Sequence, residues 1–347
     1  MKLIEYAKQK VLELAARAFV LSIGLCYASI AIVNLIFKRL RYGKDFLVVK
    51  ERSLPPLCLQ DTAYGRHAFL RLKDLKIHYV ENGDRSKPLM LFVHGFPEFW
   101  FSWRHQLKHF SSTHWVVAMD MRGYGDSEKP TSISEYKAEY LVKDVCELIK
   151  ALGRNKCTLV AHDWGGVVAW SVAAHFPEMV EKLIILNSPH PIAFHKKIKS
   201  SITQFLKSWY VFMFQIPYVP EMLFHTEDLA CFERMFGGAD NKMNVTEEDL
   251  EGYKYTFSRK GAWSPPINYY RCVLSGKDVL APVTLPTITV PTLMIWGEND
   301  VALDKELPEL TREYVTNMEV KYIANGNHFV QQDKPDEVNQ AIEDFIG

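Results

Sequence analysis

The chain has no excess of charge of either sign, and it lacks the patterns that mark metal, nucleotide and disulfide sites. Lys and Arg together number 41, as do Asp and Glu, so the formal net charge is +0. A chain without a basic excess has no bulk electrostatic attraction for nucleic acid. The twelve His show no metal-ligand spacing, and no glycine-rich phosphate loop is present. We therefore expect no metal, no organic cofactor and no nucleic-acid partner.

Disulfides are also not expected. The six cysteines form no CxxC pair and no regular framework. A chain of 347 residues with 48% hydrophobic content can bury a core without cross-links. The length permits two domains, although α/β folds often exceed the usual size of one. Internal repeats and low-complexity tracts are absent from the sequence.

One run near the N-terminus contains no charged residue. Residues 18–37, AFVLSIGLCYASIAIVNLIF, follow Arg17 and precede four basic residues: Lys38, Arg39, Arg41 and Lys44. A run of this length matches the thickness of a bilayer core when it is helical. It is longer than the apolar region of a cleaved signal peptide, and it ends in a poor cleavage site. We predict a membrane anchor over residues 1–45 with one span at about 18–37, in preference to a signal peptide or a buried amphipathic helix.

The orientation of this anchor stays open. The slightly larger number of basic residues after the span favours a cytosolic catalytic domain. Asn244 begins an acceptor triplet for N-glycosylation, which favours the opposite side, although such triplets often arise by chance. We expect a single-pass protein of the endoplasmic reticulum.

The remaining chain alternates short β-rich runs with helical stretches. The predicted strands are 76–81, 88–94, 114–120, 157–162, 181–187, 291–300 and 320–328. The predicted helices between and after them are 101–110, 137–152, 165–176 and 335–345. This alternation indicates an α/β fold, with a mostly parallel sheet that is covered by helices.

Residues 190–277 interrupt the alternation. They are rich in aromatic residues, Met and Pro, and they read as helical throughout. A helical insert in a parallel sheet is typical of a cap above the carboxyl ends of the strands, where such sheets bind ligands. The predicted organisation is an α/β core at 46–189 and 278–347 with a cap at 190–277.

The segment LVAHDWGGVVAW, residues 159–170, reads as a strand, a tight turn and the start of a helix. Asp163 stands at the apex, where many hydrolases with a G-x-S-x-G turn place a serine nucleophile. An isolated Asp before a helix is more often an N-cap. That interpretation is weaker here, because Asp300 and His328 follow further along the chain. Each comes after a predicted strand, in the order nucleophile, acid, histidine.

A second segment completes the predicted site. HGFPEFWFSW, residues 94–103, follows a predicted strand at the position that supplies one donor of an oxyanion hole. We expect the backbone N–H groups of Phe96 and Trp164 to be the two donors. HGFP could also be no more than a tight Gly-Pro turn, but its place relative to Asp163 argues for the functional interpretation.

Four segments together resemble the epoxide hydrolases of the α/β-hydrolase superfamily. They are HGFPEFWFSWR, DMRGYGDS at 120–127, HDWGG and the aromatic-rich cap. The chain is most similar to the membrane-anchored vertebrate group that contains epoxide hydrolases 3 and 4, and the resemblance covers nearly the whole chain. HGFP and HDWGG alone also occur in dehalogenases. The resemblance implies an α/β-hydrolase fold, with a mostly parallel eight-stranded sheet and a helical cap inserted after the sixth strand.

The resemblance also implies that two cap tyrosines polarise the epoxide oxygen. A segment like YVFMFQIP assigns the first role to Tyr210, and a segment like INYYR assigns the second, as proton donor, to Tyr270 in preference to Tyr269. Without the resemblance both residues would be taken as cap packing, since the chain contains 16 Tyr.

A carboxylate at residue 163 suits attack on a saturated carbon. An unperturbed Asp, with a pKa of about 3.9, is already ionised at neutral pH and needs no base. A serine would first have to lose a proton, and its product would be an ether that water cannot cleave. The Asp163 ester can instead be hydrolysed by water that His328, oriented by Asp300, activates. The expected reaction adds water to a lipophilic epoxide to give a vicinal diol, with epoxides of unsaturated fatty acids as the substrates that the resemblance suggests.

Two alternatives stay open. A haloalkane-type dehalogenase uses the same nucleophile, but many of these enzymes carry Asn after the HG pair, where this chain has Phe96. Fluoroacetate dehalogenases tend to carry Arg after the nucleophile, where this chain has Trp164. A catalytically silent, membrane-tethered binding protein would typically have lost a triad residue, and none is lost here. The expected partners are a small lipophilic epoxide and the lipid bilayer, and the sequence does not indicate an oligomeric state.

Overall fold

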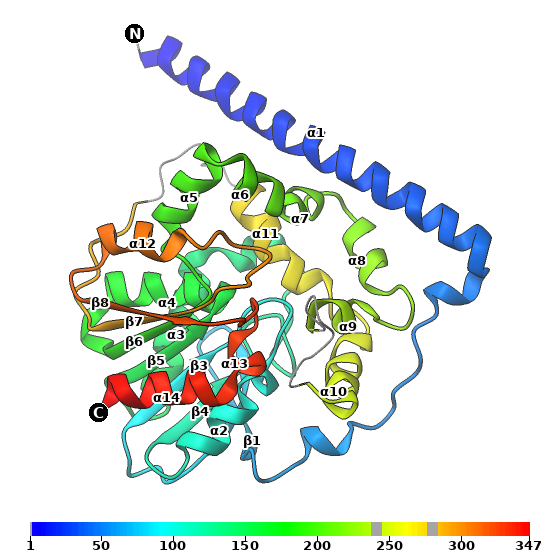
Figure 1. The fold of residues 1–347 in the computed structure, drawn as a ribbon. Helices are drawn as coiled ribbons and strands as arrows, with labels where there is room; N and C mark the ends of the chain where they lie inside the picture. Colours follow the sequence, from blue (N-terminus) through cyan, green and yellow to red (C-terminus); the bar gives the residue numbers. More distant parts are fainter. Residues whose placement is uncertain (1, 237–244, 276–283) are drawn as a thin grey trace.

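An eight-stranded sheet forms the centre of the protein (Figure 1). The computed structural model describes residues 2–236, 245–275 and 284–347. The strands lie in the order β1-β2-β4-β3-β5-β6-β7-β8. Their bounds are β1 Arg66–Arg71, β2 Lys76–Asn82, β3 Leu89–Val93, β4 Trp115–Met119, β5 Cys157–His162, β6 Val180–Leu186, β7 Thr292–Gly297 and β8 Met318–Ile323. β2 is antiparallel to both β1 and β4, and all other neighbours are parallel, which confirms the predicted fold class.

The central strands were recognisable from sequence because they are buried on both faces. Every residue of β3, β4 and β5 is buried, which explains their continuous apolar runs. The sequence analysis did not predict β1. It is an edge strand with the sequence RHAFLR and mostly exposed or half-buried side chains, so it has no apolar run to reveal it. β7 and β8 end earlier than predicted, at Gly297 and Ile323.

Helices cover both faces of the sheet. α2 (Arg104–Phe110) and α14 (Pro335–Ile346) pack together on one face, and α3 (Ala138–Ala151) and α4 (Asp163–His175) pack together on the other (Figure 1). The remaining core helices are α12 (Leu307–Thr311) and α13 (Val330–Asp333). Short 3₁₀ helices are η1 Lys44–Leu47, η2 Leu57–Leu59, η3 Trp100–Trp103, η4 Ile133–Tyr136, η5 Pro177–Met179 and η6 Arg312–Tyr314.

The described part of the chain between β6 and β7 is mainly helical as far as Ser275, whereas residues 284–291 form no helix and Ile288 makes an isolated bridge to Val315. Its helices are α5 Pro191–Ser200, α6 Ile202–Lys207, α7 Trp209–Met213, α8 Val219–Phe224, α9 Cys231–Phe236, α10 Glu247–Ser258 and α11 Ser264–Ser275. In Figure 1 they lie above and beside the sheet, at the end where the parallel strands finish. The acceptor residue Asn244 lies outside the described residues, so its modification stays a prediction.

The N-terminal helix α1 (Lys2–Tyr42) is 41 residues long and extends beyond both ends of the predicted span. Its part from Lys10 to Tyr42 is long and apolar enough to cross a membrane, and so it fits a single-pass anchor. α1 lies along the cap beside α7 and α8 (Figure 1). The Nζ of Lys38 pairs with Glu227 at 2.8 Å, close to the end of α1.

The turn between β5 and α4 is packed tightly against β3. A Cβ on Gly165 would lie 2.2 Å from the carbonyl oxygen of Val93, and a Cβ on Gly166 would lie 2.4 Å from the Cβ of Ser188. Real Cβ atoms do not approach other atoms so closely, so Gly165 is required by packing against the backbone of Val93, and Gly166 by packing against the side chain of Ser188. This close approach brings the start of α4 next to the loop that follows β3.

We expect Gly165→Ala to lower the free energy of unfolding by about 1–3 kcal/mol, because the backbone of Val93 must shift to admit a methyl group. Gly252→Ala is the matched control, since a Cβ there would contact only side-chain atoms of Leu59 and Cys58, none closer than 3.2 Å. Chemical denaturation of the two purified variants measures the difference. Equal stabilities would show that the turn can relax.

Candidate active site

Asp163 occupies a strained position at the start of α4. Its φ is 46°, in the left-handed region that non-glycine residues rarely adopt. The Oγ of Ser188 donates a hydrogen bond of 2.7 Å to its backbone carbonyl, and a Cβ on Gly95 would lie 2.5 Å from its own Cβ. The N-cap of α4 is His162, and no side chain caps the helix. Asp163 is therefore not a helix cap, and its carboxylate is turned toward the loop after β3.

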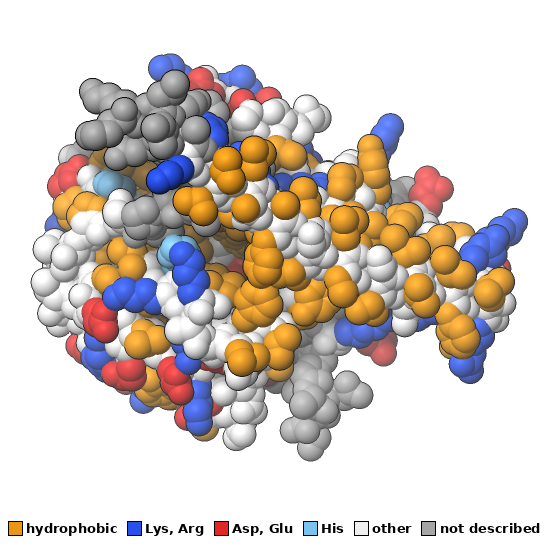
Figure 2. Space-filling model, turned by 90° about the horizontal axis from the view of Figure 1, so that it is seen from above, with side chains coloured by type: hydrophobic (Ala, Val, Ile, Leu, Met, Phe, Trp, Pro, Cys, Tyr) orange, Lys and Arg blue, Asp and Glu red, His pale blue; other side chains and the backbone are white. Residues whose placement is uncertain are grey.

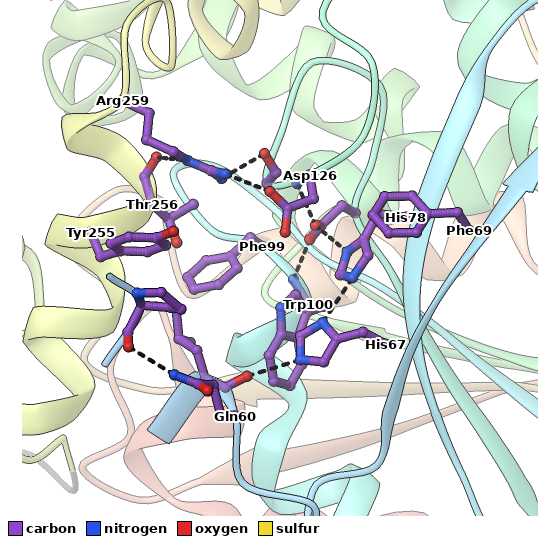
Figure 3. A pocket seen from close by; sticks show the side chains of 14 residues that line it. Gln60, His67, Phe69, His78, Phe99, Trp100, Asp126, Tyr255, Thr256 and Arg259 are labelled. Atoms are coloured by element: carbon purple, nitrogen blue, oxygen red, sulfur yellow. Dashed lines mark hydrogen bonds and ion pairs between the residues drawn. The ribbon is translucent and has the colours of Figure 1, made fainter. Parts of the chain in front are cut away.

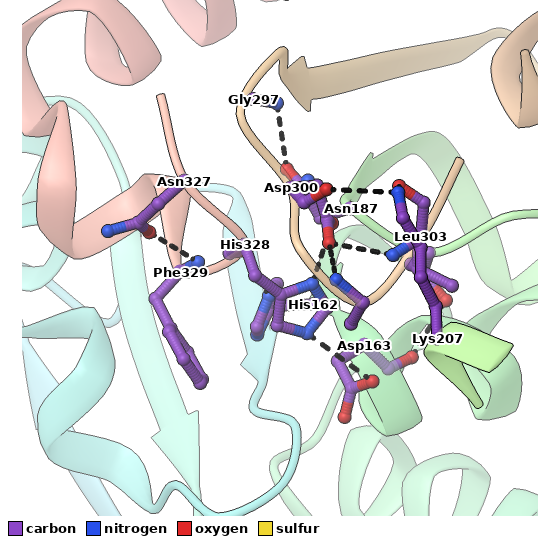
Figure 4. A network of polar contacts seen from close by, with 12 residues as sticks. His162, Asp163, Asn187, Lys207, Gly297, Asp300, Leu303, Asn327, His328 and Phe329 are labelled. Atoms are coloured by element: carbon purple, nitrogen blue, oxygen red, sulfur yellow. Dashed lines mark hydrogen bonds and ion pairs between the residues drawn. The ribbon is translucent and has the colours of Figure 1, made fainter. Parts of the chain in front are cut away.

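The carboxylate of Asp163 has two close neighbours. Its Oδ1 accepts a hydrogen bond of 2.8 Å from the backbone N–H of Phe96. Its Oδ2 lies 3.7 Å from Nε2 of His328, whose Nδ1 lies 2.7 Å from Oδ2 of Asp300 (Figure 4). The structure thus brings together four of the residues that the sequence singled out. They come from the loops or turns after β3, β5, β7 and β8, whose carboxyl ends meet at one edge of the sheet.

Asp300 is held by donors that the sequence analysis missed. Its Oδ1 accepts from the backbone N–H groups of Ala302 and Leu303, and its Oδ2 also accepts from the side-chain amide of Asn187 at 2.6 Å (Figure 4). Asn187 directly follows β6 and has a φ of 38°. Its Oδ1 accepts from the N–H of Gly297, so it links β6 to the Asp300 loop. In the sequence, Asn187 could have been noticed as a polar residue that directly follows an apolar strand.

A buried carboxylate and histidine lie beneath the site, and they too were missed. Glu98 Oε2 lies 2.7 Å from Nδ1 of His162 and accepts from the N–H of Gly95, while Oε1 accepts from Gln331 and Gln332. Nε2 of His162 donates to the backbone carbonyl of His328 at 2.8 Å. This pair joins the loop after β3 to the backbone of His328. Glu98 lies in the motif HGFPE and His162 in HDWGG, so their place in these motifs could have identified them as site residues.

The electrostatics of the triad follow from two carboxylates on either side of one imidazole. Burial acts to lower the pKa of His328, but the negative charges of Asp300 and Asp163 outweigh it and raise that pKa well above its usual value. Burial acts in the opposite sense on the pKa of Asp163, yet His328 and the Phe96 N–H hold it below its usual value. The pKa of Asp300 is lowered too, chiefly by the charge of His328 against the effect of burial. At neutral pH the site therefore holds Asp163 as a carboxylate.

Two cap tyrosines lie near this carboxylate, close enough for its charge to act on both phenols. The Tyr270 ring packs edge-on against Phe96 and Trp164, with centroid distances of 5.2 and 5.0 Å. The ring of Tyr210 lies 5.8 Å from that of Tyr270. Burial, followed by the charge of Asp163, raises the pKa of each phenol, so both keep their protons. Tyr269 differs, because its hydroxyl donates to the carbonyl of Arg122 at 2.7 Å and is thereby occupied.

The second predicted oxyanion donor, the N–H of Trp164, directly follows Asp163 in the first turn of α4. The ring of Trp164 lies against the rings of Tyr269 and Tyr270. The Phe96 N–H already binds an oxygen of the Asp163 carboxylate, at the place where an ester carbonyl oxygen would lie after alkylation.

A separate cavity of about 270 Å³ lies between β1, β2, η3 and the end of α10 (Figure 3). His67, His78 and Asp120 form a hydrogen-bonded chain along it, and Arg259 pairs with Asp126 at its side. None of the predicted site residues lines this cavity. Among the described residues, no group of three or more His, Cys, Asp or Glu side chains is arranged to hold a metal ion.

Comparison with known proteins agrees with this geometry. Residues 88–335 match the family model of the alpha/beta hydrolase fold. The chain is 43% identical to human Epoxide hydrolase 4 over 331 residues, which cover 93% of this chain and 90% of that protein. The chain belongs to the epoxide hydrolases of the α/β-hydrolase superfamily. Epoxide hydrolase 3 of Xenopus tropicalis is 41% identical over 85% of this chain and 82% of its own length.

The epoxide hydrolase fold is also matched by solved structures. The Bacillus megaterium epoxide hydrolase in complex with an inhibitor has a TM-score of 0.74 and 32% identity, covering 80% of this chain and 99% of its own. The fold class, the assignment to a family of enzymes and the resemblance drawn from the sequence motifs are all confirmed.

We expect Asp163→Asn to lower the pKa of His328, because it removes one of the two negative charges that favour the imidazolium. The expected sign is that His328 titrates at lower pH in the variant than in the unmodified protein. Histidine NMR signals followed against pH measure this difference, with the exposed Asp344→Asn as control. An unchanged titration would mean that Asp300 alone sets the charge of His328.

Proposed function

We propose that this protein hydrolyses lipophilic epoxides to vicinal diols through a covalent alkyl ester on Asp163. The observation that carries the proposal is a single arrangement. An ionised carboxylate lies between the Phe96 N–H and His328, and two buried, protonated phenols of the cap lie near it, with the Tyr270 ring packed on Phe96 and Trp164 and the Tyr210 ring next to it. A nucleophile and two oxygen-binding donors are what ring opening requires.

In the first step, a carboxylate oxygen of Asp163 attacks an epoxide carbon and the C–O bond of the ring breaks. The electron pair of that bond stays on the ring oxygen. Tyr210 and Tyr270 hydrogen-bond this oxygen, and Tyr270 transfers its proton to it. The product is an ester between Asp163 and a β-hydroxyalkyl group. Tyr270 regains its proton from solvent before the next cycle.

In the second step, His328 takes a proton from water, which attacks the carbonyl carbon of the Asp163 ester. Alkylation supports this step, because the ester no longer carries the negative charge that raised the pKa of His328. The imidazole then more readily releases its own proton and becomes a base. The N–H groups of Phe96 and Trp164 bind the oxyanion, and collapse of the tetrahedral species breaks the bond to the alkyl oxygen. His328 gives this oxygen the proton that it took from water, which releases the diol. The Asp163 carboxyl group then loses its proton to solvent, which restores the carboxylate and balances the proton that Tyr270 regains.

The alternatives fit the geometry less well. A halide leaves without a proton and needs no acid, whereas Tyr210 and Tyr270 are held protonated next to the nucleophile. A silent binding protein would not need the Asp300–His328 pair that is aligned on Asp163. Water is the only co-substrate in the proposed reaction, and no cofactor takes part.

The proposed setting is a membrane, and within the cell the endoplasmic reticulum. The apolar helix α1 supports attachment to a bilayer, and substrates that dissolve in lipid are then concentrated where the enzyme lies. An aromatic-rich cap around Tyr270 supports an apolar substrate, with fatty-acid epoxides as the first class to assay.

The function is tested by one turnover in water enriched in heavy oxygen, with enzyme in excess over a styrene-type epoxide. We expect the first diol to be unlabelled, since its new oxygen comes from Asp163, and label to enter only in later turnovers. A labelled first diol would contradict the ester mechanism. A parallel assay with a haloalkane would favour the dehalogenase alternative if it released halide while no diol formed from the epoxide.

We expect Tyr210→Phe and Tyr270→Phe each to slow ring opening by roughly tenfold to a thousandfold, and the double variant to lose activity, because the departing oxygen is left without a donor. Tyr269→Phe is the matched control, since its hydroxyl is bound to Arg122. Single-turnover rates of ester formation measure the effect. An active double variant would remove the tyrosines from the mechanism.

A further inference from the structure

The face of α1 that points away from the protein exposes large apolar side chains. Figure 2 shows them as a hydrophobic band along the helix, with Lys and Arg side chains around its ends. The exposed fraction lies between 55% and 66% for Phe19, Leu25, Ile30, Val33, Ile36 and Phe37. An apolar surface of this length marks a membrane or protein contact.

The opposite face of α1 is packed against the cap. Ala28 and Leu35 are 1% and 8% exposed, and a Cβ on Gly24 would lie 2.5 Å from the carbonyl oxygen of Phe212 in α7. The ring of Tyr27 lies 5.9 Å from that of Trp209, also in α7. These contacts use the middle of the apolar run 18–37. In this packing α1 lies along the cap, and because an α-helix with its side chains is about 10 Å wide, a bilayer that contacts the outer face of α1 lies about one helix width from α7.

The cap helices next to α1 expose apolar side chains of their own. Ile202 and Leu206 of α6, Trp209 of α7 and Met222 of α8 are between 41% and 80% exposed. In Figure 1, α6, α7 and α8 lie along the side of the cap that α1 crosses. Tryptophan is favoured where one end of a side chain is in lipid and the other in water.

We propose that these four cap residues and the outer face of α1 form one surface that docks on a lipid bilayer, here called the cap–bilayer surface. A bilayer is the occupant because the surface is continuous with the anchor. The exposed Arg39, Arg41 and Lys44 beyond the apolar run suit anionic headgroups. The statement that the delivered substrate is an epoxide rests on the proposed function.

The cap–bilayer surface lies directly beside the proposed chemistry. Trp209 contacts α1 and is followed in the same five-residue helix by Tyr210, with 6.2 Å between their ring centroids. Tyr210 in turn lies against Tyr270. The helix that carries Tyr210 thus also reaches the proposed lipid contact, and we expect docking to lower the KM of a lipophilic epoxide more than that of a water-soluble one.

Contact with lipid is tested on the full chain in vesicles of phosphatidylcholine and phosphatidylserine. Ile202→Cys and Leu54→Cys carry the same fluorescent label, in a background where Cys26, Cys58 and Cys272 are replaced by Ser. Ile202 and Leu54 are each 80% exposed, but Leu54 lies in the linker before β1. We expect lipids brominated near the headgroup to quench the label at 202 and not at 54. Unquenched fluorescence at 202, or equal quenching at both positions, would overturn the proposal.

The consequence for catalysis is tested with two epoxides, one long-chain and dissolved in the vesicles, the other short and water-miscible. We expect the double variant Ile202→Asp, Leu206→Asp to raise the KM of the long-chain epoxide on the order of tenfold and to leave kcat and the short epoxide unchanged. Leu54→Asp is the control and changes neither substrate. Equal kinetics of the double variant and the unmodified protein would contradict delivery from lipid.

Failure of the proposed function gives a different result. In that case the unmodified protein forms no diol from either epoxide, while quenching at residue 202 still reports whether the cap contacts lipid. Failure of the docking proposal leaves both epoxides turned over, with no quenching at residue 202.

Discussion

The left-handed backbone of Asp163 is the constraint on which the rest of the site depends. A non-glycine residue in this conformation costs of order 1–3 kcal/mol, so the surrounding structure must hold it. The absence of side chains at Gly95 and Gly165 lets the turn press against β3 and its loop, and Ser188 binds the Asp163 carbonyl. The strain thereby aims the carboxylate at Phe96 and at the cap, away from its own helix.

A second constraint is electrostatic. Asp163 and Asp300 flank His328 in a buried site, and burial by itself would drive protons onto the carboxylates. The imidazole and a set of backbone and amide donors hold both carboxylates ionised instead. Glu98 and His162 tie the loop after β3 to the backbone of His328, so that the partners keep their separations. Charge and position are maintained by the same hydrogen-bond network.

The cap connects this site to the surface that carries α1. Tyr210 belongs to α7, which contacts α1 through Trp209 and Phe212. The part of the molecule that faces the nucleophile is thus also the part that faces the anchor. The same short helix that supports an active-site phenol lies next to the longest apolar segment of the chain, which couples the position of the site to that of the anchor.

The sequence by itself determined much of this. Continuous apolar runs located the strands that are buried on both faces, an uncharged run located the long N-terminal helix, and the motifs around Asp163, Asp300 and His328 stood after strands whose ends had to meet at one edge of a parallel sheet. Periodicity could not reveal β1, since an edge strand with charged ends has no apolar run. Only the tertiary structure decided that Glu98, His162 and Asn187 support the site, because their partners are distant in sequence. It also decided that α1 lies against α7, because contacts between distant segments are set by packing, which no local pattern records.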